Sequence, residues 1–553
     1  MNKYIALLIP SILFWNVNKS VAQETNLKKE VQVVKPYEPS ISDAYKINLQ
    51  PKIEDTIKVN PNFNYSIIQR PINTYFQPNP ISAARMLPEP LKDLQRGLIK
   101  IGIGNRSLPL FEAYYTSPRN KEFSYGAWVN ANNNIGKVKL ANNSKVDAQS
   151  NVTNMGLQGK RMFADKILSG NITYNRNHYL YYGYDTDNAT VTPTSDKQTT
   201  NNLNANLGFQ STYKDSSRLN YFINTNFGHL SDKYDMQETK IKGYGGVNKY
   251  LKNEQFGSEI SLTQYLRNNQ FFLQNNTIFT LSPWIKFFGK QWRVQAGVNI
   301  TYDANDVTNN TYFFPKAHFS YDIVSNYIVP YVELNGYLTE NSYSELLRTN
   351  PWLNPGSNGW NTANKLILTG GIKGKFSAKI TYDVQASYSI IDSMAFFQNI
   401  SIDATNPLLN RFGLVFDNME QTKIQGELSI APSRKVNMLF HAEYFSYKTE
   451  TLEHPWNLPD YTAFFRINYN LFGRIFANAN VFMVGNRWVQ GINGNAPKKL
   501  SSYADINLGL DYSYNGRLFV FLNLNNLTSS NYQQWYLYPV QGFNIQIGAS
   551  YRL

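Results

Sequence analysis

The last stretch of the chain, 541–553, places the strongest constraint on the fold. Read in steps of two, it separates into an apolar and a polar face. The apolar face holds Phe543, Ile545, Ile547, Ala549, Tyr551 and Leu553. Strict alternation is typical of a β-strand between two environments. In lipid, unpaired backbone groups are costly, so such a strand must pair on both edges. The stretch therefore predicts the closing strand of a transmembrane β-barrel.

The preceding sequence alternates short and long connections between strand-like segments. Tight turns are predicted at 119–120, 164–165, 215–216, 252–253, 289–290, 325–326, 377–378, 432–433, 472–473 and 515–516. Longer connections are predicted at 183–200, 231–238, 304–310, 341–364, 391–419, 448–459, 486–502 and 527–540, with less distinct ones near 105–108, 134–148 and 268. This sorting by length is typical of outer-membrane barrels, whose short turns face the periplasm. For residues 97–553 we therefore predict an all-β, antiparallel outer-membrane barrel of about 22 strands.

Composition agrees with a barrel wall. The mean hydropathy is −0.42, and no run of eighteen apolar residues follows the N-terminus, so a transmembrane helix in the body of the chain is excluded. A barrel tolerates this hydropathy because only alternate residues face lipid. Aromatic residues make up 15% of the chain, which suits strands and interfacial girdles. A soluble β-sandwich also alternates, but its loops do not sort by length.

Charge and cysteine content narrow the partners. The net charge is +14, and the positive residues are spread along the chain rather than clustered. This distribution favours a wet lumen and contacts with anionic outer-membrane lipid over nucleic acid, so no nucleic-acid partner is predicted. Cysteine is absent, which excludes disulfides, thiolate metal sites and a lipidated N-terminal cysteine.

The N-terminal part differs from the rest. Residues 1–22 have the basic start, the apolar core and the small residues of a secretory signal, with cleavage predicted after Ala22. Residues 23–96 contain nine of the 24 prolines, between Pro36 and Pro90. This density disfavours a central sheet strand, yet the segment carries too many apolar residues for a solvated linker. We expect it to lie in the barrel lumen or against a periplasmic partner.

No catalytic or cofactor motif stands out. The sequence has no Gly-x-Ser-x-Gly elbow, no His-Glu-x-x-His and no phosphate loop, and its five histidines lack metal-ligand spacing. Several acids fall on polar strand faces: Asp383, Glu427, Glu443, Asp505 and Asp511. Paired carboxylates can perform acid–base chemistry, but a wet lumen of mixed charges explains them equally. We predict no catalytic residues, no metal, no cofactor and no enzymatic activity.

Five tryptophans fall in the predicted long connections: Trp352, Trp360, Trp456, Trp488 and Trp535. Aromatic anchors concentrate binding energy, so these residues are a candidate contact platform for a glycan or a surface protein. The alternative is that they pack the loops together or mark the outer girdle.

The end of the chain carries a series of motifs: Leu518–Leu527, Tyr532, Trp535–Pro539, Gly542-Phe543 and Ser550–Leu553. Together they resemble the end of a TonB-dependent receptor, a class of outer-membrane barrels of about this strand number. The resemblance covers about forty residues. It implies the outer membrane of a Gram-negative bacterium and a role in transport.

The chain also departs from that class. TonB-dependent receptors carry a folded N-terminal plug domain, whereas only the proline-rich residues 23–96 precede the first predicted strand here. Glu30–Val34 resembles the short apolar box that TonB engages, but five such residues arise easily by chance, so TonB engagement stays open. The final residue is Leu553 instead of the usual aromatic.

Two functions follow from these observations. The first is a transport or channel-like role related to TonB-dependent receptors, which rests on family analogy. The second is a non-transporting barrel subunit of an outer-membrane assembly, whose residues 23–96 bind a periplasmic partner or whose loops bind a surface partner. The location of residues 23–96 distinguishes the two.

Overall fold

The computed structural model describes residues 95–106, 110–186, 191–194, 196–213, 217–491 and 496–553. The predicted signal, its cleavage after Ala22, the proline-rich segment 23–96 and the Glu30–Val34 box lie outside these residues, except for residues 95–96. The first strand begins at Gly97.

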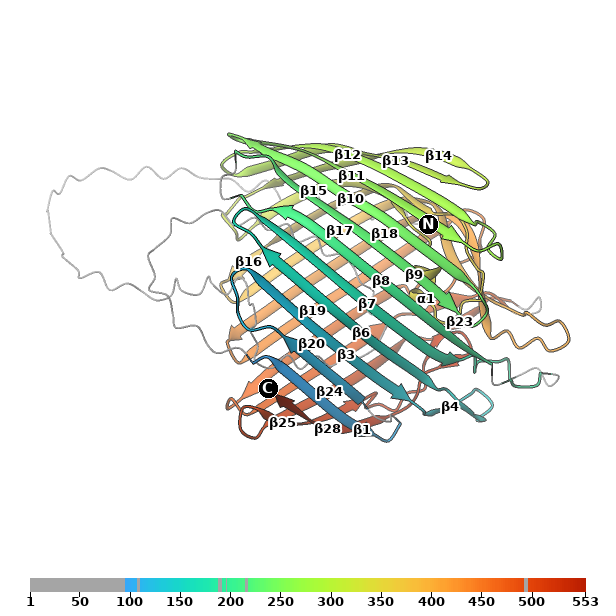
Figure 1. The fold of residues 1–553 in the computed structure, drawn as a ribbon. Coiled ribbons are helices and arrows are strands. Elements are labelled where there is room, and N and C mark those ends of the chain that lie inside the picture. The colour runs from blue at the N-terminus through green and yellow to red at the C-terminus, as the bar shows by residue number, and fades with distance from the viewer. Residues whose placement is uncertain (1–94, 107–109, 187–190, 195, 214–216, 492–495) are drawn as a thin grey trace, which may run out of the picture. The chain divides into compact units, whose positions relative to one another are not determined.

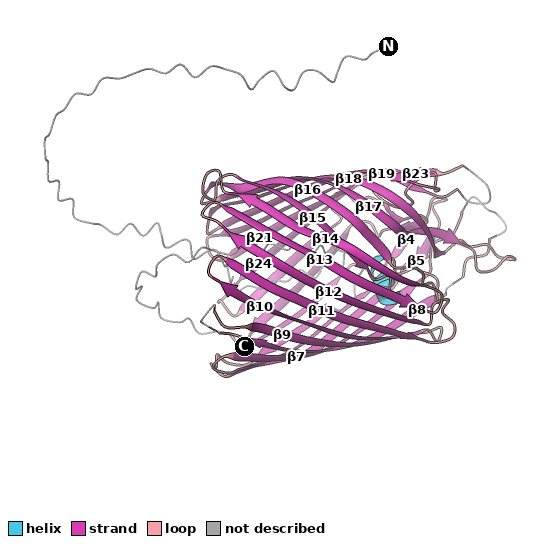
Figure 2. Ribbon diagram, turned by 90° about the horizontal axis from the view of Figure 1, so that it is seen from above, coloured by secondary structure: helices cyan, strands magenta, loops and turns pink. Residues whose placement is uncertain are grey.

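Twenty-two antiparallel strands form one sheet that closes on itself (Figures 1 and 2). The barrel strands are β1 (Gly97–Gly104), β2 (Leu110–Thr116), β3 (Phe123–Asn134), β6 (Ser150–Met162), β7 (Lys166–Leu180), β8 (Lys197–Ser211), β9 (Asn220–Asp232), β10 (Gln237–Leu251), β11 (Glu254–Arg267), β12 (Asn275–Phe288), β13 (Trp292–Asn305), β14 (Asn309–Tyr321), β15 (Val329–Thr339), β16 (Thr362–Ser377), β17 (Ile380–Ile400), β18 (Arg411–Ser433), β19 (Val436–Thr449), β20 (Tyr461–Leu471), β21 (Ile475–Val484), β24 (Tyr503–Ser513), β25 (Leu518–Asn525) and β28 (Asn544–Arg552). The predicted fold class and strand number are confirmed.

The last strand closes the barrel as its alternation predicts. β28 pairs with β25 on one edge and with β1 on the other, in a register that runs from Leu98 opposite Arg552 to Gly104 opposite Gln546. Ile547 on the outer face is 51% exposed, whereas Gln546 on the inner face is 9% exposed. Both edges of the strand are therefore paired, as a lipid environment requires.

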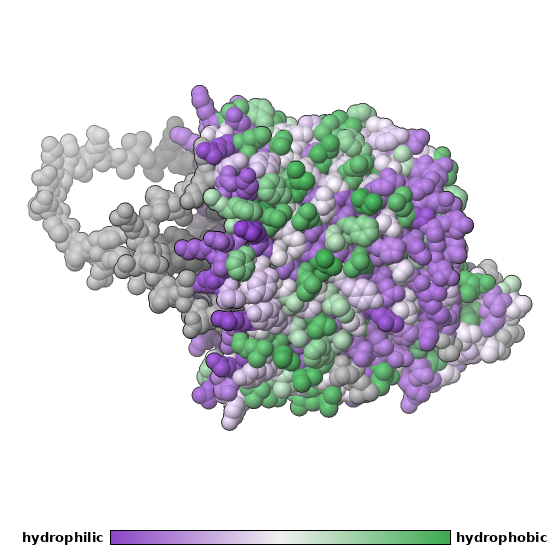
Figure 3. Space-filling view, viewed as in Figure 1, coloured by the Kyte–Doolittle hydropathy of each residue, from purple (hydrophilic) through white to green (hydrophobic). Residues whose placement is uncertain are grey.

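The outer surface of the wall is apolar. On β11, Ile260 and Leu262 point outward and are exposed, whereas Thr263 faces the lumen and is buried. Figure 3 shows hydrophobic residues over the wall and hydrophilic residues toward the end that carries the long loops. Such a band on a closed barrel is the surface that faces lipid, which places the protein in the outer membrane. Among the described residues, no helix is long and apolar enough to cross a membrane.

The connections sort by length as predicted. Of the ten predicted short turns, 215–216 lies outside the described residues, and 432–433 forms the last two residues of β18, with the turn itself at 434–435. The other eight fall at connections between consecutive strands at the turn end of the barrel, which by the rule for such barrels faces the periplasm. The longer connections lie at the opposite, loop end. Three of them carry small hairpins, and one carries a helix: β4 (Lys137–Lys139) with β5 (Lys145–Asp147), β22 (Arg487–Val489) with β23 (Lys498–Leu500), β26 (Gln533–Trp535) with β27 (Tyr538–Pro539), and α1 (Tyr343–Thr349).

One predicted connection has the wrong bounds. The segment 391–419 was expected to be a loop, but β17 continues to Ile400 and β18 begins at Arg411. The register shifts between Ile391 and Met394, and Ser393 has a φ of 53°. A bulge of this kind changes which face the following side chains occupy, and so it interrupts the alternation on which the prediction depends.

Candidate functional site

The connection between β15 and β16 folds back against the inner wall at the loop end of the barrel. It spans 340–361 and carries α1, which lies within the barrel outline in Figure 2. Its side chains contact lumen-facing residues of β8 to β11, including a hydrogen bond of 3.2 Å from Asn202 Nδ2 to Ser344 Oγ. We call this segment the inner loop.

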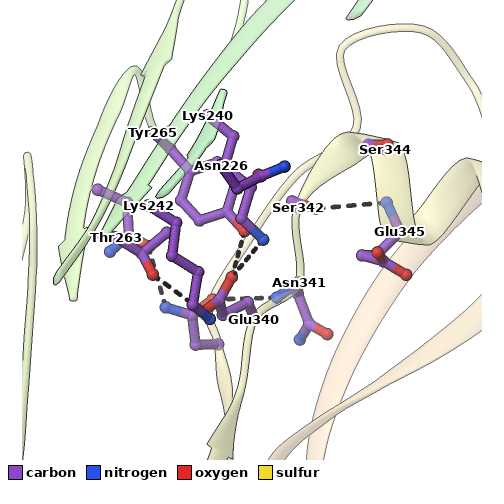
Figure 4. Close-up of polar contacts among 12 residues, drawn as sticks. Asn226, Lys240, Lys242, Thr263, Tyr265, Glu340, Asn341, Ser342, Ser344 and Glu345 are labelled. Carbon is purple, nitrogen blue, oxygen red and sulfur yellow. Dashed lines mark hydrogen bonds and ion pairs between the residues drawn. The ribbon is translucent and has the colours of Figure 1, made fainter. Parts of the chain in front are cut away.

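Glu340 ties the start of the inner loop to the wall (Figure 4). Its carboxylate accepts hydrogen bonds from Lys240 Nζ at 2.8 Å and Lys242 Nζ at 3.1 Å. Thr263 Oγ1 donates to it at 3.2 Å, and the Tyr265 hydroxyl donates as well. Burial alone would raise the pKa of Glu340, but the two lysines outweigh it and hold the pKa at about 2. The carboxylate is therefore charged at any ordinary pH.

A second carboxylate fixes the start of α1. Glu238 of β10 accepts hydrogen bonds from the backbone N–H of Tyr343 at 2.9 Å and of Ser344 at 3.1 Å. Arg267 Nε donates to the same carboxylate at 2.7 Å, and both charged side chains are almost fully buried. Free N–H groups at a helix start favour a negative charge nearby. The Glu238 carboxylate, which projects from the wall, therefore accepts hydrogen bonds from the free N–H groups of the first turn of α1. The Tyr343 hydroxyl adds a bond of 2.8 Å to Asp232.

The end of the inner loop is also attached. Asn361 Nδ2 donates to Asp303 at 3.0 Å and to Asn276 at 3.1 Å, on β13 and β12. Asn358 Nδ2 donates to the carbonyl of Leu273 at 2.7 Å. The inner loop is thus attached at both ends by polar contacts to the wall.

An apolar cluster forms between the inner loop and its neighbours. Its buried members are Leu230, Phe271, Tyr343, Leu346, Leu347, Leu353, Phe397, Phe412 and Tyr538. These residues come from the inner loop, from β9, β17 and β18, and from the connections after β11 and β25. We call this set the mouth cluster. At about 25 cal/mol per Å² of apolar surface, this burial stabilises the packing of the inner loop against its neighbours.

Arg411 joins the mouth cluster to a further connection. Its guanidinium lies between the rings of Tyr181 and Tyr234, at 4.5 and 4.8 Å from their centroids, and it pairs with Asp196. Burial would raise the pKa of Asp196, but the hydrogen bond from Tyr234 and the charge of Arg411 lower it overall. This charge pair links Asp196, just before β8, to Arg411 at the start of β18.

The five predicted tryptophans lie in three places. Trp352 stacks on Tyr538 at 4.0 Å, and Trp535 contacts Phe397 at 5.1 Å, so both border the mouth cluster. Trp456 and Trp488 belong to a second cluster, where His454 stacks on Trp488 at 4.0 Å. Trp360 contacts Phe272. The structure does not gather all five into one surface, and their binding role stays a prediction.

The predicted lumenal acids form contacts with nearby polar groups. Asp383 accepts from the Tyr331 hydroxyl at 2.8 Å, and Asp505 from the Tyr532 hydroxyl at 2.6 Å. Glu427 and Glu443 flank His441, at 3.4 and 3.5 Å from its two ring nitrogens. Asp511 is also buried on the inner face. Among the described residues, no group of acids and histidines has the arrangement of a metal site.

The sequence did not identify Glu340 or its lysine partners. Alternation places Lys240 and Lys242 on one face of β10. Their partner Glu340, however, lies 100 positions after Lys240 in the chain. Only the three-dimensional path of the inner loop brings these residues together. The sole signal in the sequence was the length of the 341–364 connection.

The fold resembles that of known outer-membrane receptors. The ferric-catecholate import receptor Fiu from E. coli K12 superposes with a TM-score of 0.62 at 9% identity, covering 84% of this chain and 82% of that one. The FrpB iron transporter from Neisseria meningitidis gives 0.62 at 10%, covering 84% and 82%. The copper transporter OprC gives 0.60 at 11%, covering 84% and 81%. No family model matches the sequence, and no curated protein matches it. The chain therefore has the 22-strand fold of these transporters.

Proposed function

We propose that the protein transports a solute across the outer membrane and that the inner loop is its extracellular gate. The observation that carries the proposal is the attachment of the inner loop to the wall through Glu340. Two ion pairs, from Glu340 to Lys240 and Lys242, hold the start of this loop. Breaking them would free the start of the loop from the wall. The iron and copper transporters that share the fold support a transport role by analogy.

Residues 23–96 have two roles open to them. Inside the lumen they would narrow the channel and set its selectivity. In the periplasm they would bind a partner by adding extended segments to it, with TonB as one candidate through Glu30–Val34. The second location suits the alternative function, in which the barrel anchors an outer-membrane assembly. The assembly function is supported by the apolar, proline-rich composition of this segment, because a free linker would carry fewer apolar residues.

Single-channel conductance in planar bilayers tests the gate. We compare the chain from Gln23 onward with its Glu340→Gln variant, which removes the charge that pairs with two lysines. The matched control is Glu345→Gln, since Glu345 lies on the same loop but pairs with Arg348 of its own helix. The proposal expects frequent openings for Glu340→Gln and a closed channel for both wild type and control. Identical traces for all three proteins would refute the gate.

A deletion separates the two functions. We compare the same chain with one that begins at Leu94. A large rise in conductance on deletion supports residues 23–93 as a lumenal obstruction and strengthens the transport role. Equal, wide-open conductance of both proteins favours a periplasmic arm whose partner seals the pore. No conductance in either protein, together with no effect of Glu340→Gln, favours the assembly subunit.

A further inference from the structure

One sector of the inner wall is built from amides. On β7, β8 and β9 the lumen-facing positions repeatedly carry asparagine: Asn171, Asn175, Asn202, Asn204, Asn206, Asn224 and Asn226. Asn226 Nδ2 donates to Asn206 Oδ1 at 2.7 Å, and Asn206 Nδ2 donates to Asn171 Oδ1 at 2.9 Å. These bonds run across three neighbouring strands. We call this sector, with the lumen-facing residues of β6 and β10, the amide wall.

The amide wall contains a recess. Its volume is about 600 Å³, and it lies toward the turn end of β3 to β10. Its lumen-facing lining includes Gln158, Ser169, Asn171, Asn206, Asn224, Asn226 and Tyr244. A recess of about this size is in the range of small-molecule sites, which hold roughly 300–1,000 Å³.

The chemistry of the lining selects a ligand class. Within the described lining there is no aspartate or glutamate, and one of its two lysines, Lys242, is paired with Glu340. Each primary amide offers both a donor and an acceptor, as does each hydroxyl of a sugar or polyol. The ring of Tyr244 adds an aromatic face, while its hydroxyl bonds Glu259 at 3.2 Å. Neutral hydroxyl groups match such a lining better than a bare charge does.

We propose that this recess binds a neutral polyhydroxylated solute of oligosaccharide size on its way through the barrel. The proposal deepens the transport role above and rests on it for its biological meaning. The recess shares Lys242 and Asn226 with the surroundings of Glu340 (Figure 4). A bound solute would therefore lie beside the anchor of the inner loop.

Binding is tested separately from passage. We titrate the detergent-solubilised chain from Gln23 onward with maltotriose as the neutral probe and with citrate as the anionic one, using calorimetry. We expect maltotriose to bind and citrate not to bind. In Asn206→Ala/Asn226→Ala, loss of two amide partners should weaken maltotriose binding about tenfold. The control Asn478→Ala removes a lumen-facing amide of β21 outside the recess and should bind as wild type does.

The outcomes distinguish this proposal from the transport role. Absence of maltotriose binding, equal binding of citrate, or equal weakening by Asn478→Ala would overturn the recess, even where conductance still supports a gated channel. Binding that depends on Asn206 and Asn226 supports the recess, even where bilayer experiments show no channel. Heat-dependent migration on gels verifies that each variant retains a folded barrel.

Discussion

The two sides of the lumen pair their polar, lumen-facing side chains in different ways. On β7 to β9 the amide wall carries asparagine side chains that bond one another. The opposite sector, β15 to β19, carries charges that face each other: Glu333, Lys373, Asp383, Lys423, Glu427, His441 and Glu443. We call it the charged wall. Because an unpaired buried charge costs far more than an unpaired amide, the charged wall depends more on each of its members.

The largest effect is expected at Glu443, which is 5% exposed in the charged wall. It accepts from Thr462 at 3.1 Å and lies near His441 and Lys423. Glu443→Ala removes the buried carboxylate that lies beside Lys423 and His441, and it should lower the free energy of unfolding by about 4 kcal/mol. Urea unfolding in micelles, followed by tryptophan fluorescence, measures the change. A loss below that of an amide-wall variant would remove the contrast between the walls.

A pH series gives the next effect. The lysines hold the pKa of Glu340 at about 2 despite burial, below its ordinary value. At pH values above about 4.3, the pKa of glutamate in the unfolded chain, such a carboxylate contributes its full stabilisation to the anchored loop. This contribution is lost as the pH falls from there through the pKa of Glu340 in the folded protein. The full effect is about 3 kcal/mol. Protection factors of the α1 amides, measured by hydrogen exchange below pH 5 and corrected for the intrinsic pH dependence of exchange, should fall in wild type, whereas those of Glu340→Gln should not change with pH there.

A smaller effect is expected at Asn206, in the amide wall. Asn206→Ala removes two side-chain hydrogen bonds that water can replace. The free energy of unfolding should fall by only about 1 kcal/mol. The same urea measurement applies. A loss comparable to that of Glu443→Ala would mean that the asparagines act as a rigid network rather than as a hydrated surface.

The smallest effect is expected at Glu345, whose pair with Arg348 is exposed. Glu345→Gln should change the free energy of unfolding by less than about 0.5 kcal/mol. This variant sets the baseline against which the anchored carboxylates are compared, because it removes a charge from the same loop. A large change would indicate an unrecognised role for Arg348.

Alternation and turn chemistry were sufficient to predict the barrel. Each wall position alternates between lipid and lumen, and so the strands, the short turns and the closure by 541–553 could be predicted from local sequence. The extended ends of β17 and β18 could not, because the bulge at Ser393 interrupts the period. The anchor of the inner loop could not be predicted either, since it depends on contacts between Glu340 and a strand far away in the chain.

The pairing of β1 with β28 has a consequence for how the barrel forms. Asn105 and Ile545 are hydrogen-bonded although 440 positions separate them in the chain. Contacts of such high sequence separation are slow to form, because the loop entropy must be lost before the contact gives any gain. The seam can close only after the last residues have been synthesised and exported. Until then the sheet has two open edges that can pair with other chains, so assembly requires these edges to be shielded until insertion.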